Sequence, residues 1–224
     1  MPFKKTSAMR KEIEIRHIPV IENLEDREFL AVMTEHIRPE KVGCVNWTEY
    51  SYVPEVDLRL AFSDNVLALL YTVKEDHILG TVIDDNAPVW EDSCVETFIK
   101  DPLSDNYYNF EINCIATKLA ALRRSRTDCD LFSAEKLSKI RCFSSLPHEK
   151  TDTINTEQEE WNLALMIPFS LLGLDKAPDY LDVNFYKCGD NCRQPHYLSW
   201  SPIELPEPNF HCPEFFGRIN LIKK

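Results

Sequence analysis

The amino-acid sequence predicts an all-β fold, an antiparallel β-sandwich of about ten strands. The first observation is a hydrophobic period of two after residue 45, where Val56, Leu58 and Leu60 alternate with polar residues. The second is the close spacing of such segments, which leaves no room for crossover helices. The third is a hydrophobic content of 44%, which is enough for a sizeable core.

One helix is predicted before the strands, over residues 23–37. Asn23 is a candidate N-cap, and acidic residues fill the first turn, where the helix dipole favours them. Phe29, Met33 and Ile37 recur at four-residue spacing and therefore predict one apolar face.

The predicted strands follow one another closely through the rest of the chain. Besides "VDLRLAFS", strand patterns occur in "NVLALLYTVK", "SCVETFIK", "YYNFEINCIA", "KLAALRR", "LSKIRCF", "WNLALMI", "LDVNFYKC", "HYLSW" and "GRINLI". Residues 168–174 are predicted to form one helical turn, and the proline-rich residues 202–213 a long loop. Since no linker divides the strands, residues 46–224 are predicted to form one domain, with residues 1–45 as an N-terminal extension that packs on it.

Charge and hydropathy disfavour several kinds of partner. The formal net charge of -12 repels phosphate backbones and anionic lipids, so neither nucleic acid nor membrane is an expected partner. No run of 18 apolar residues predicts a transmembrane helix. No apolar segment follows the basic first residues as in a signal peptide, so the chain as written is expected in the cytoplasm, whereas a processed N-terminus would imply a secreted or periplasmic protein.

The eight cysteines are expected to be mostly reduced thiols, because several lie in apolar strand patterns and a chain of this size needs no disulfide framework. A structural zinc site is an alternative, since Cys188, Cys192 and His196 are spaced by four and His211 and Cys212 follow. The spacing differs from the paired CxxC motifs of zinc ribbons, which disfavours zinc.

No motif fixes a cofactor, and calcium is a candidate beside the zinc alternative. The acid-rich residues 84–92 and 101–105 offer the oxygen ligands that Ca²⁺ prefers. Ordinary solvated loops are the alternative interpretation of both segments.

Polar side chains gather on one face of three predicted strands. If Val95, Phe110 and Val183 point to the core, the period of two turns the acids, amides and tyrosines of these strands outward together. The outward set comprises Cys94, Glu96, Phe98, Tyr107, Asn109, Glu111, Asn113, Asp182, Asn184 and Tyr186. A solvated sheet face is the alternative, but Asn and Asp are poor strand formers, so their placement has a cost that ligand binding would justify.

Carbohydrate is the ligand that such a face suits. Carboxylates and carboxamides form paired hydrogen bonds that match vicinal hydroxyls. Trp90 and Trp200 lie in loops or at strand ends, so they are predicted to be exposed and to stack on the apolar face of a sugar ring. Trp161 begins an apolar strand and is predicted to lie in the core.

Three segments together resemble a known family. "PVWEDSCVETFI", "YYNFEINCIATKL" and "NFYKCGD…PHYLSWSPIELPEPNFHCPEFFGRI" are similar in order and spacing to the carbohydrate-binding module family 9-like domains, above all to the stand-alone group of gut Bacteroidetes. The resemblance covers about residues 45–222. It implies a β-sandwich related to the DOMON superfamily, whose best-known relatives are non-catalytic xylanase modules that hold terminal sugars between two tryptophans.

The resemblance also implies roles for single residues. Trp90 matches the first clamp tryptophan of a W-x-D-x-x-x-E pattern, and Glu96 matches the acid that hydrogen-bonds sugar hydroxyls. Trp200 matches the second clamp tryptophan, and relatives often bind calcium. The stand-alone group's signature is matched by His196, Asn209 and His211. The predicted carbohydrate-binding residues are therefore Trp90, Glu96, Asn109, Glu111, Asn113, His196 and Trp200.

The sequence thus predicts a non-catalytic protein that binds a mono- or oligosaccharide, in association with glycan-degrading enzymes and polysaccharide utilisation. Two other functions stay open. Two of Asp92, Glu96 and Glu111 would supply the carboxyl pair of a glycoside hydrolase. Some DOMON relatives are haem or redox-partner modules, and Met, His and Cys residues would supply axial ligands here, although the sequence has no CxxCH motif.

Overall fold

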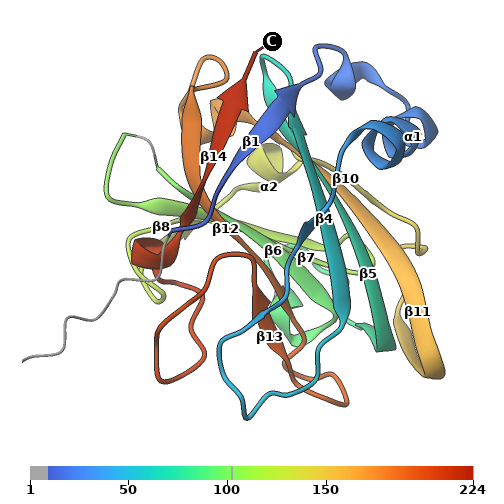
Figure 1. The fold of residues 1–224 in the computed structure, drawn as a ribbon. Coiled ribbons are helices and arrows are strands. Elements are labelled where there is room, and N and C mark those ends of the chain that lie inside the picture. The colour runs from blue at the N-terminus through green and yellow to red at the C-terminus, as the bar shows by residue number, and fades with distance from the viewer. Residues whose placement is uncertain (1–9, 102, 224) are drawn as a thin grey trace, which may run out of the picture.

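The computed structural model describes residues 10–101 and 103–223 and folds them into a β-sandwich (Figure 1). Within these residues, fourteen strands belong to one sheet, with the central order β10-β11-β5-β4-β1-β14-β12-β6-β7-β8-β9. The strands are β1 Glu12–His17, β2 Glu40–Lys41, β3 Cys44–Val45, β4 Glu55–Phe62, β5 Val66–Gly80, β6 Cys94–Lys100, β7 Tyr107–Asn113, β8 Lys118–Arg123, β9 Cys129–Leu131, β10 Arg141–Ser144, β11 Thr151–Pro168, β12 Tyr180–Cys188, β13 Tyr197–Ser199 and β14 Gly217–Ile222.

The sheet folds into two layers that face each other across the main core. In Figure 1, β4, β5 and β11 run side by side, and β6 and β7 cross behind them. Leu69 of the first layer and Val95 and Phe110 of the second belong to one hydrophobic cluster. The Tyr71 hydroxyl crosses this core and donates a hydrogen bond of 2.9 Å to the main-chain carbonyl of Glu96. The core therefore fixes the backbone of β6.

The predicted all-β sandwich is confirmed, and each of the ten predicted strand segments forms a strand. Four more strands, β1, β2, β3 and β9, were not expected from the sequence pattern. β1 lies within residues 1–45, and it pairs in parallel with β14 and β4, whereas the other recorded pairings are antiparallel. It thereby connects the two layers. The sequence pattern of β1 did not indicate a strand clearly, because Ile15 is the one fully buried residue in it.

The predicted N-terminal helix is present as α1, Asp26–His36, although its N-cap differs from the prediction. Glu25 caps it in a capping box with Glu28, while Asn23 ends a preceding 3-10 turn. Phe29 and Met33 are buried as expected. They pack on the outer side of the first layer, where the small side chains Ala61, Ala68 and Ala164 leave room for the helix.

Short helices fill the remaining connections. They are η1 Ile21–Asn23, η2 Val89–Glu91, α2 Ala134–Leu137, η3 Phe169–Leu172 and η4 Pro213–Phe215. η3 is the helical turn predicted over residues 168–174, and Gly173 ends it in the left-handed conformation with φ of 72°. Over the described residues, no helix is long and apolar enough to cross a membrane.

A second hydrophobic cluster covers the outer face of β6, β7 and β12. The proline-rich residues 202–213 fold back over this face and contribute Ile203, Phe210 and Cys212. Phe210 stacks on Tyr186 of β12 with ring centroids 4.1 Å apart, and its carbonyl accepts a hydrogen bond from the Tyr186 hydroxyl. The predicted outward face is therefore largely covered by protein, and what stays open is a small cavity.

Candidate functional site

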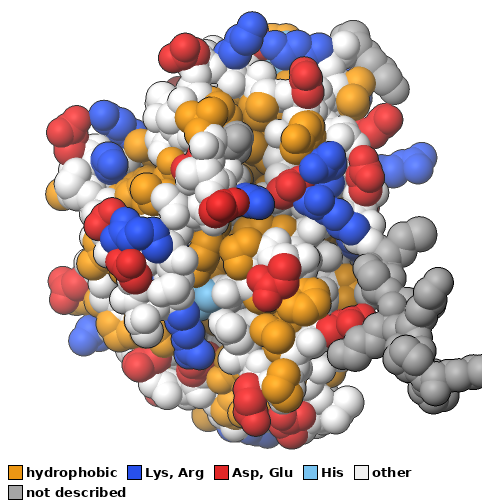
Figure 2. Space-filling view, turned by 90° about the vertical axis from the view of Figure 1, so that its left-hand side faces the viewer, with side chains coloured by type: hydrophobic (Ala, Val, Ile, Leu, Met, Phe, Trp, Pro, Cys, Tyr) orange, Lys and Arg blue, Asp and Glu red, His pale blue; other side chains and the backbone are white. Residues whose placement is uncertain are grey.

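A cavity of about 190 Å³ opens between β6, β7, β8, β12 and the covering loop. Its lining includes Trp90, Glu96, Glu111, Arg123, Arg126, Cys188, Asp190, Tyr197, Asn209, Phe210 and His211. On the face of the molecule drawn in Figure 2, charges of both signs lie among exposed hydrophobic side chains. The cavity has the same mixed character, with carboxyl, guanidinium, imidazole and aromatic groups close together.

Trp90 lies on η2, and the short turn holds its half-buried ring at the cavity. The loop that carries it is fixed by Asp92, whose carboxylate accepts hydrogen bonds from the backbone N–H groups of Thr81 and Val82 at 2.9 Å each. Asn113 also donates to Asp92, at 2.9 Å. Asp92 and Asn113 therefore support the loop of Trp90 and do not line the cavity.

Glu96 and Glu111 form a cross-strand pair on the cavity floor, directly opposite each other on β6 and β7. Asn109 donates to Glu111 at 2.6 Å, and Arg123 donates to the Asn109 carbonyl oxygen at 2.8 Å. This chain of hydrogen bonds orients one acid and leaves the other Glu111 oxygen without a partner among the described residues. Asn109 thus acts behind the cavity wall.

Burial shifts the pKa of both acids upward. Burial first, and the neighbouring Glu111 charge second, raise the pKa of Glu96 well above its ordinary value. Burial also raises the pKa of Glu111 to about 7, against the lowering effects of Asn109 and Arg123. The pair therefore carries less than two negative charges at neutral pH, so its carboxyl groups can donate as well as accept hydrogen bonds.

His211 closes the far side of the cavity as a neutral imidazole. The Tyr107 hydroxyl lies 3.0 Å from its Nδ1 atom, and the ring packs against Phe98. Burial, assisted by the charges of Arg123 and Arg126, lowers the pKa of His211 to about 3. The ring therefore stays uncharged beside the two arginines throughout the physiological range.

This shift predicts an acid-dependent loss of stability. An unfolded histidine has a pKa of about 6.5, so the unfolded chain binds the extra proton as the pH falls from about 6.5 towards 3. The free energy of unfolding should then lose about 1.4 kcal/mol per pH unit from His211 alone. Urea unfolding of the wild type and His211→Gln between pH 6.5 and 4.5 measures the difference in slope, and equal slopes would contradict the assignment.

Trp200 does not lie at the cavity, and the expectation that it is exposed is wrong. Its ring is fully buried in the main core against Phe185, at a centroid distance of 5.4 Å. Its indole N–H donates to Glu40 at 3.1 Å, and the Lys11 ammonium lies over the ring. Trp200 continues the alternation of Leu198 and therefore points to the core side. Trp161 is buried as predicted.

His196 also lies away from the cavity, in a buried polar network on the core side of β12. The Lys187 ammonium lies 2.9 Å from a Glu75 carboxylate oxygen and 2.8 Å from His196 Nε2. The Trp161 indole N–H donates to the other Glu75 oxygen at 2.7 Å. Burial and the Lys187 charge lower the pKa of His196 well below its ordinary value. This histidine therefore serves the fold.

Sequence reasoning missed several cavity residues that come from outside the three central strands. Arg123 ends β8, Asp190 follows β12, and Tyr197 begins β13. Phe210 reaches the cavity because the proline-rich loop folds back over the sheet. The basic end of "KLAALRR", next to the strand of Glu111, was the one available signal for Arg123.

The structure bears on the zinc hypothesis and leaves the calcium hypothesis untested. Cys188 points into the cavity while His196 is held in the buried network, so the zinc set of Cys188, Cys192 and His196 does not gather among the described residues. In the calcium segments, Asp92 is committed to its loop, and the Asp101 carboxylate accepts from Leu103 N–H at 2.8 Å. Calcium stays a prediction. All eight cysteines are unpaired.

Solved structures of other proteins share this fold. A crystal structure of a candidate carbohydrate-binding protein from Bacteroides uniformis ATCC 8492 is 33% identical, with a TM-score of 0.88 over 95% of this chain and 100% of that chain. A family 9 carbohydrate-binding module of Caldicellulosiruptor kristjanssonii has the same fold in its glucose complex (14% identity, TM-score 0.61, 96% of this chain and 97% of that chain) and in its cellotriose complex (13%, 0.59, 96% and 95%).

A search among curated proteins finds no match. The sequence profile of carbohydrate-binding family 9 matches residues 27–221, which cover α1 from its second residue and every strand from β2 to β13, with all but the last residue of β14. The match includes Trp90, both floor acids and the loop that covers them. The chain belongs to carbohydrate-binding family 9.

Proposed function

We propose that the chain binds a carbohydrate in the cavity beside Trp90 and does not alter it chemically. The observation that carries the proposal is the placement of a half-buried tryptophan next to the cross-strand acids Glu96 and Glu111. An indole face covers the apolar C–H side of a sugar ring, and the acids exchange hydrogen bonds with its hydroxyls. Family membership supports the ligand class, since the family 9 module named above was crystallised with glucose and cellotriose.

The size of the cavity favours one terminal sugar residue. Its volume of about 190 Å³ lies below the roughly 300–1,000 Å³ of pockets for drug-sized ligands. A monosaccharide, or the last residue of an oligosaccharide, is the unit that fits. The wall that lacks a second tryptophan is supplied by Tyr197, Phe210 and His211.

The polar groups on the floor have capacity left for a ligand. Among the described residues, one oxygen of Glu96, one oxygen of Glu111 and the Nη2 atom of Arg123 form no hydrogen bond. All three side chains line the cavity. A sugar that presents two neighbouring hydroxyls would pair with the acids and the guanidinium together, which favours a specific orientation of the ring.

Calorimetry tests this function directly. The full chain is titrated with a panel that contains glucose, xylose, galactose, mannose and their β-linked oligosaccharides. We expect saturable heat with at least one sugar, and an affinity that changes little between a monosaccharide and its oligomer, because one residue fills the cavity. Absence of heat with every sugar would contradict the proposal.

Glycoside hydrolysis is the second candidate, because two acids with raised pKa values share the cavity. Glu96 and Glu111 project from neighbouring positions of one sheet face, whereas the two carboxyl groups of glycosidases flank the scissile bond. Asp92, the third acid of this hypothesis, is committed to its loop. Turnover of aryl glycosides that is lost in Glu96→Gln and Glu111→Gln would favour this function over simple binding.

A further inference from the structure

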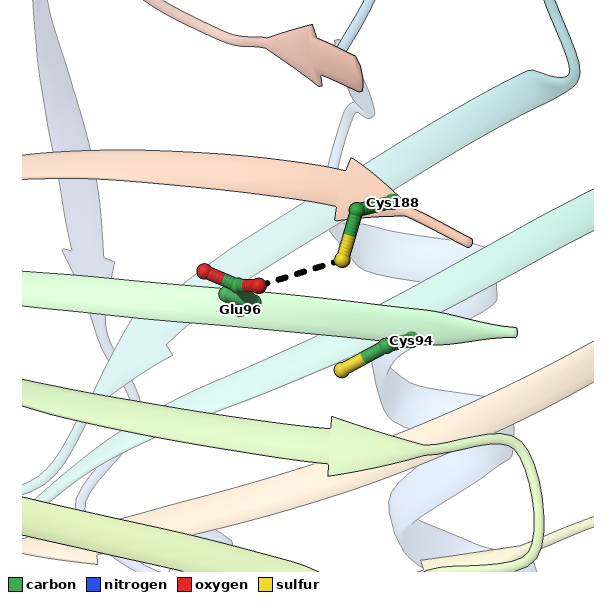
Figure 3. A group of neighbouring side chains, drawn as sticks. All are labelled: Cys94, Glu96 and Cys188. Atoms are coloured by element: carbon green, nitrogen blue, oxygen red, sulfur yellow. Dashed lines mark hydrogen bonds between the residues drawn. The ribbon is translucent and has the colours of Figure 1, made fainter. Parts of the chain in front are cut away.

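Two cysteines and one of the floor acids converge at the edge of the cavity. Cys94 and Cys188 are directly opposite each other on β6 and β12, and Glu96 lies two residues from Cys94 on the same face. The Cys188 sulfur lies 3.1 Å from Glu96 Oε1, and the two sulfurs and a Glu96 oxygen all lie within 4.8 Å of one another. Figure 3 shows the Cys188 sulfur turned towards the Glu96 carboxylate and the Cys94 side chain close to both.

These separations suit one tetrahedral metal ion. With Zn–S bonds of about 2.3 Å and a Zn–O bond of about 2.1 Å, ligand atoms around zinc lie roughly 3.5–3.8 Å apart. Small side-chain rotations bring the observed separations into this range, because the two strands already set the register. Among the described residues, this is the one group of three or more His, Cys, Asp or Glu side chains that is close enough to share an ion.

We propose that Cys94, Cys188 and Glu96 form a binding site for a zinc ion at the edge of the cavity. Two thiolates select zinc over calcium or magnesium, which prefer oxygen ligands. Each cysteine binds as the thiolate, and its proton passes to solvent as the ion enters. The zinc site shares Glu96 with the proposed sugar site. It is tested without sugar, so either proposal can fail while the other holds.

The surroundings fit an ion with three protein ligands. Cys94, Cys188 and Glu96 are 0%, 1% and 4% exposed, so the site is dry on the protein side. Cys188 and Glu96 also line the cavity, which gives zinc an entry path and leaves the fourth position for water. Two thiolates and a carboxylate leave one excess negative charge with Zn²⁺, and Arg123, whose charge acts on Glu96, lies in the same cavity.

Cobalt is the spectroscopic probe for this site. The full chain, fully reduced and freed of metal, is titrated with Co²⁺, and Zn²⁺ then competes for the site. We expect one equivalent to produce a thiolate-to-cobalt charge-transfer band together with the visible bands of tetrahedral cobalt, and zinc to abolish both. Absence of a saturable charge-transfer band would overturn the proposal.

Substitutions locate the ion. Cys94→Ser and Cys188→Ser should each weaken cobalt affinity at least tenfold, and Glu96→Gln should weaken affinity while the charge-transfer band remains. Cys142→Ser is the matched control, because Cys142 lies on β10 outside this group, and it should behave as the wild type. Weakened cobalt affinity in Cys142→Ser, or wild-type affinity in Cys94→Ser or Cys188→Ser, would overturn the assignment.

Alkylation of the unmodified chain gives a result even if the serine variants fail to fold. Zinc is added to the reduced wild-type protein, and the reaction of each of its eight cysteines with iodoacetamide is followed by peptide mass spectrometry. We expect zinc to slow the alkylation of Cys94 and Cys188 at least fivefold and to leave the other six nearly unchanged. Protection of a different set, or of none, would overturn the proposal.

Discussion

Trp90→Ala is expected to raise the Kd for the best sugar of the panel by roughly 30-fold, or about 2 kcal/mol. The substitution removes the ring that would cover the apolar face of the sugar, while the floor acids remain in place. Because Trp90 is half-buried and Asp92 fixes its loop, the fold should survive. Isothermal titration calorimetry measures the affinity, and circular dichroism confirms that the variant is folded.

Two further variants sharpen this test. Trp90→Phe keeps a flat ring at the same place and should lose only a few-fold in affinity. Tyr180→Ala removes an exposed aromatic residue that does not line the cavity, and it should bind as the wild type. Equal affinity of Trp90→Ala and the wild type, or a comparable loss in Tyr180→Ala, would show that the sugar lies elsewhere.

Lys187→Met is expected to lower the free energy of unfolding by about 3–5 kcal/mol. Lys187 and Glu75 are both fully buried, with 2.9 Å between the ammonium nitrogen and a carboxylate oxygen. Removal of the lysine leaves the Glu75 charge in the core with no cationic partner among the described residues, because the nearby His196 is neutral. Urea denaturation measures the effect, and an unchanged midpoint would contradict this account of the network.

Two control variants test whether the loss of stability comes from an unpaired buried charge or from the loss of a side-chain contact. Glu75→Gln with Lys187→Met removes both charges and keeps an acceptor for the Trp161 indole, so the double variant should be more stable than Lys187→Met alone. Lys139→Met breaks the surface pair with Glu135 and should leave the midpoint nearly unchanged. A double variant no more stable than the single one would argue against an unpaired charge.

The sequence predicted correctly which side chains of the central strands point to the core, because hydrophobic residues alternate there with a period of two. Val95 and Phe110 lie in the main core as expected, and Glu96 and Glu111 share the opposite face of the sheet. Strand β1 was not predicted because it forms by parallel pairing with β14, near the other end of the chain. Local patterns carry no information about such long-range pairing.

The two tryptophans show why the site was predicted only in part. Both stand near turns, and sequence alone does not tell an exposed ring from one that fills the core. The alternation of Leu198 and Trp200 indicated a buried Trp200 ring. The turn residues next to Trp200 favoured an exposed ring, and the prediction followed them. Arg123 and Phe210 reach the cavity through the fold of two connections, which no spacing in the sequence predicts.

The buried ion pair of Lys187 and Glu75 was not predicted either, because it also depends on contacts between distant segments. A lysine within a strand normally points to solvent, and its burial is intelligible only once Glu75 of β5 lies opposite. The cysteine group has the same origin, since Cys94 and Cys188 are 94 positions apart and meet through the pairing of β6 with β12. Both the ion pair and the cysteine group arise from contacts between strands distant in the sequence, and no local sequence motif marks either.

The central claim is that a sugar sits on Trp90, and an NMR titration of the four tryptophan indole N–H signals tests it most directly. With ¹⁵N-labelled protein and the best sugar of the panel, the Trp90 signal, assigned through Trp90→Phe, should shift saturably. The signals of Trp47, Trp161 and Trp200, which are buried in the protein, should move little. A saturable shift at any of these three with Trp90 unmoved would contradict the account.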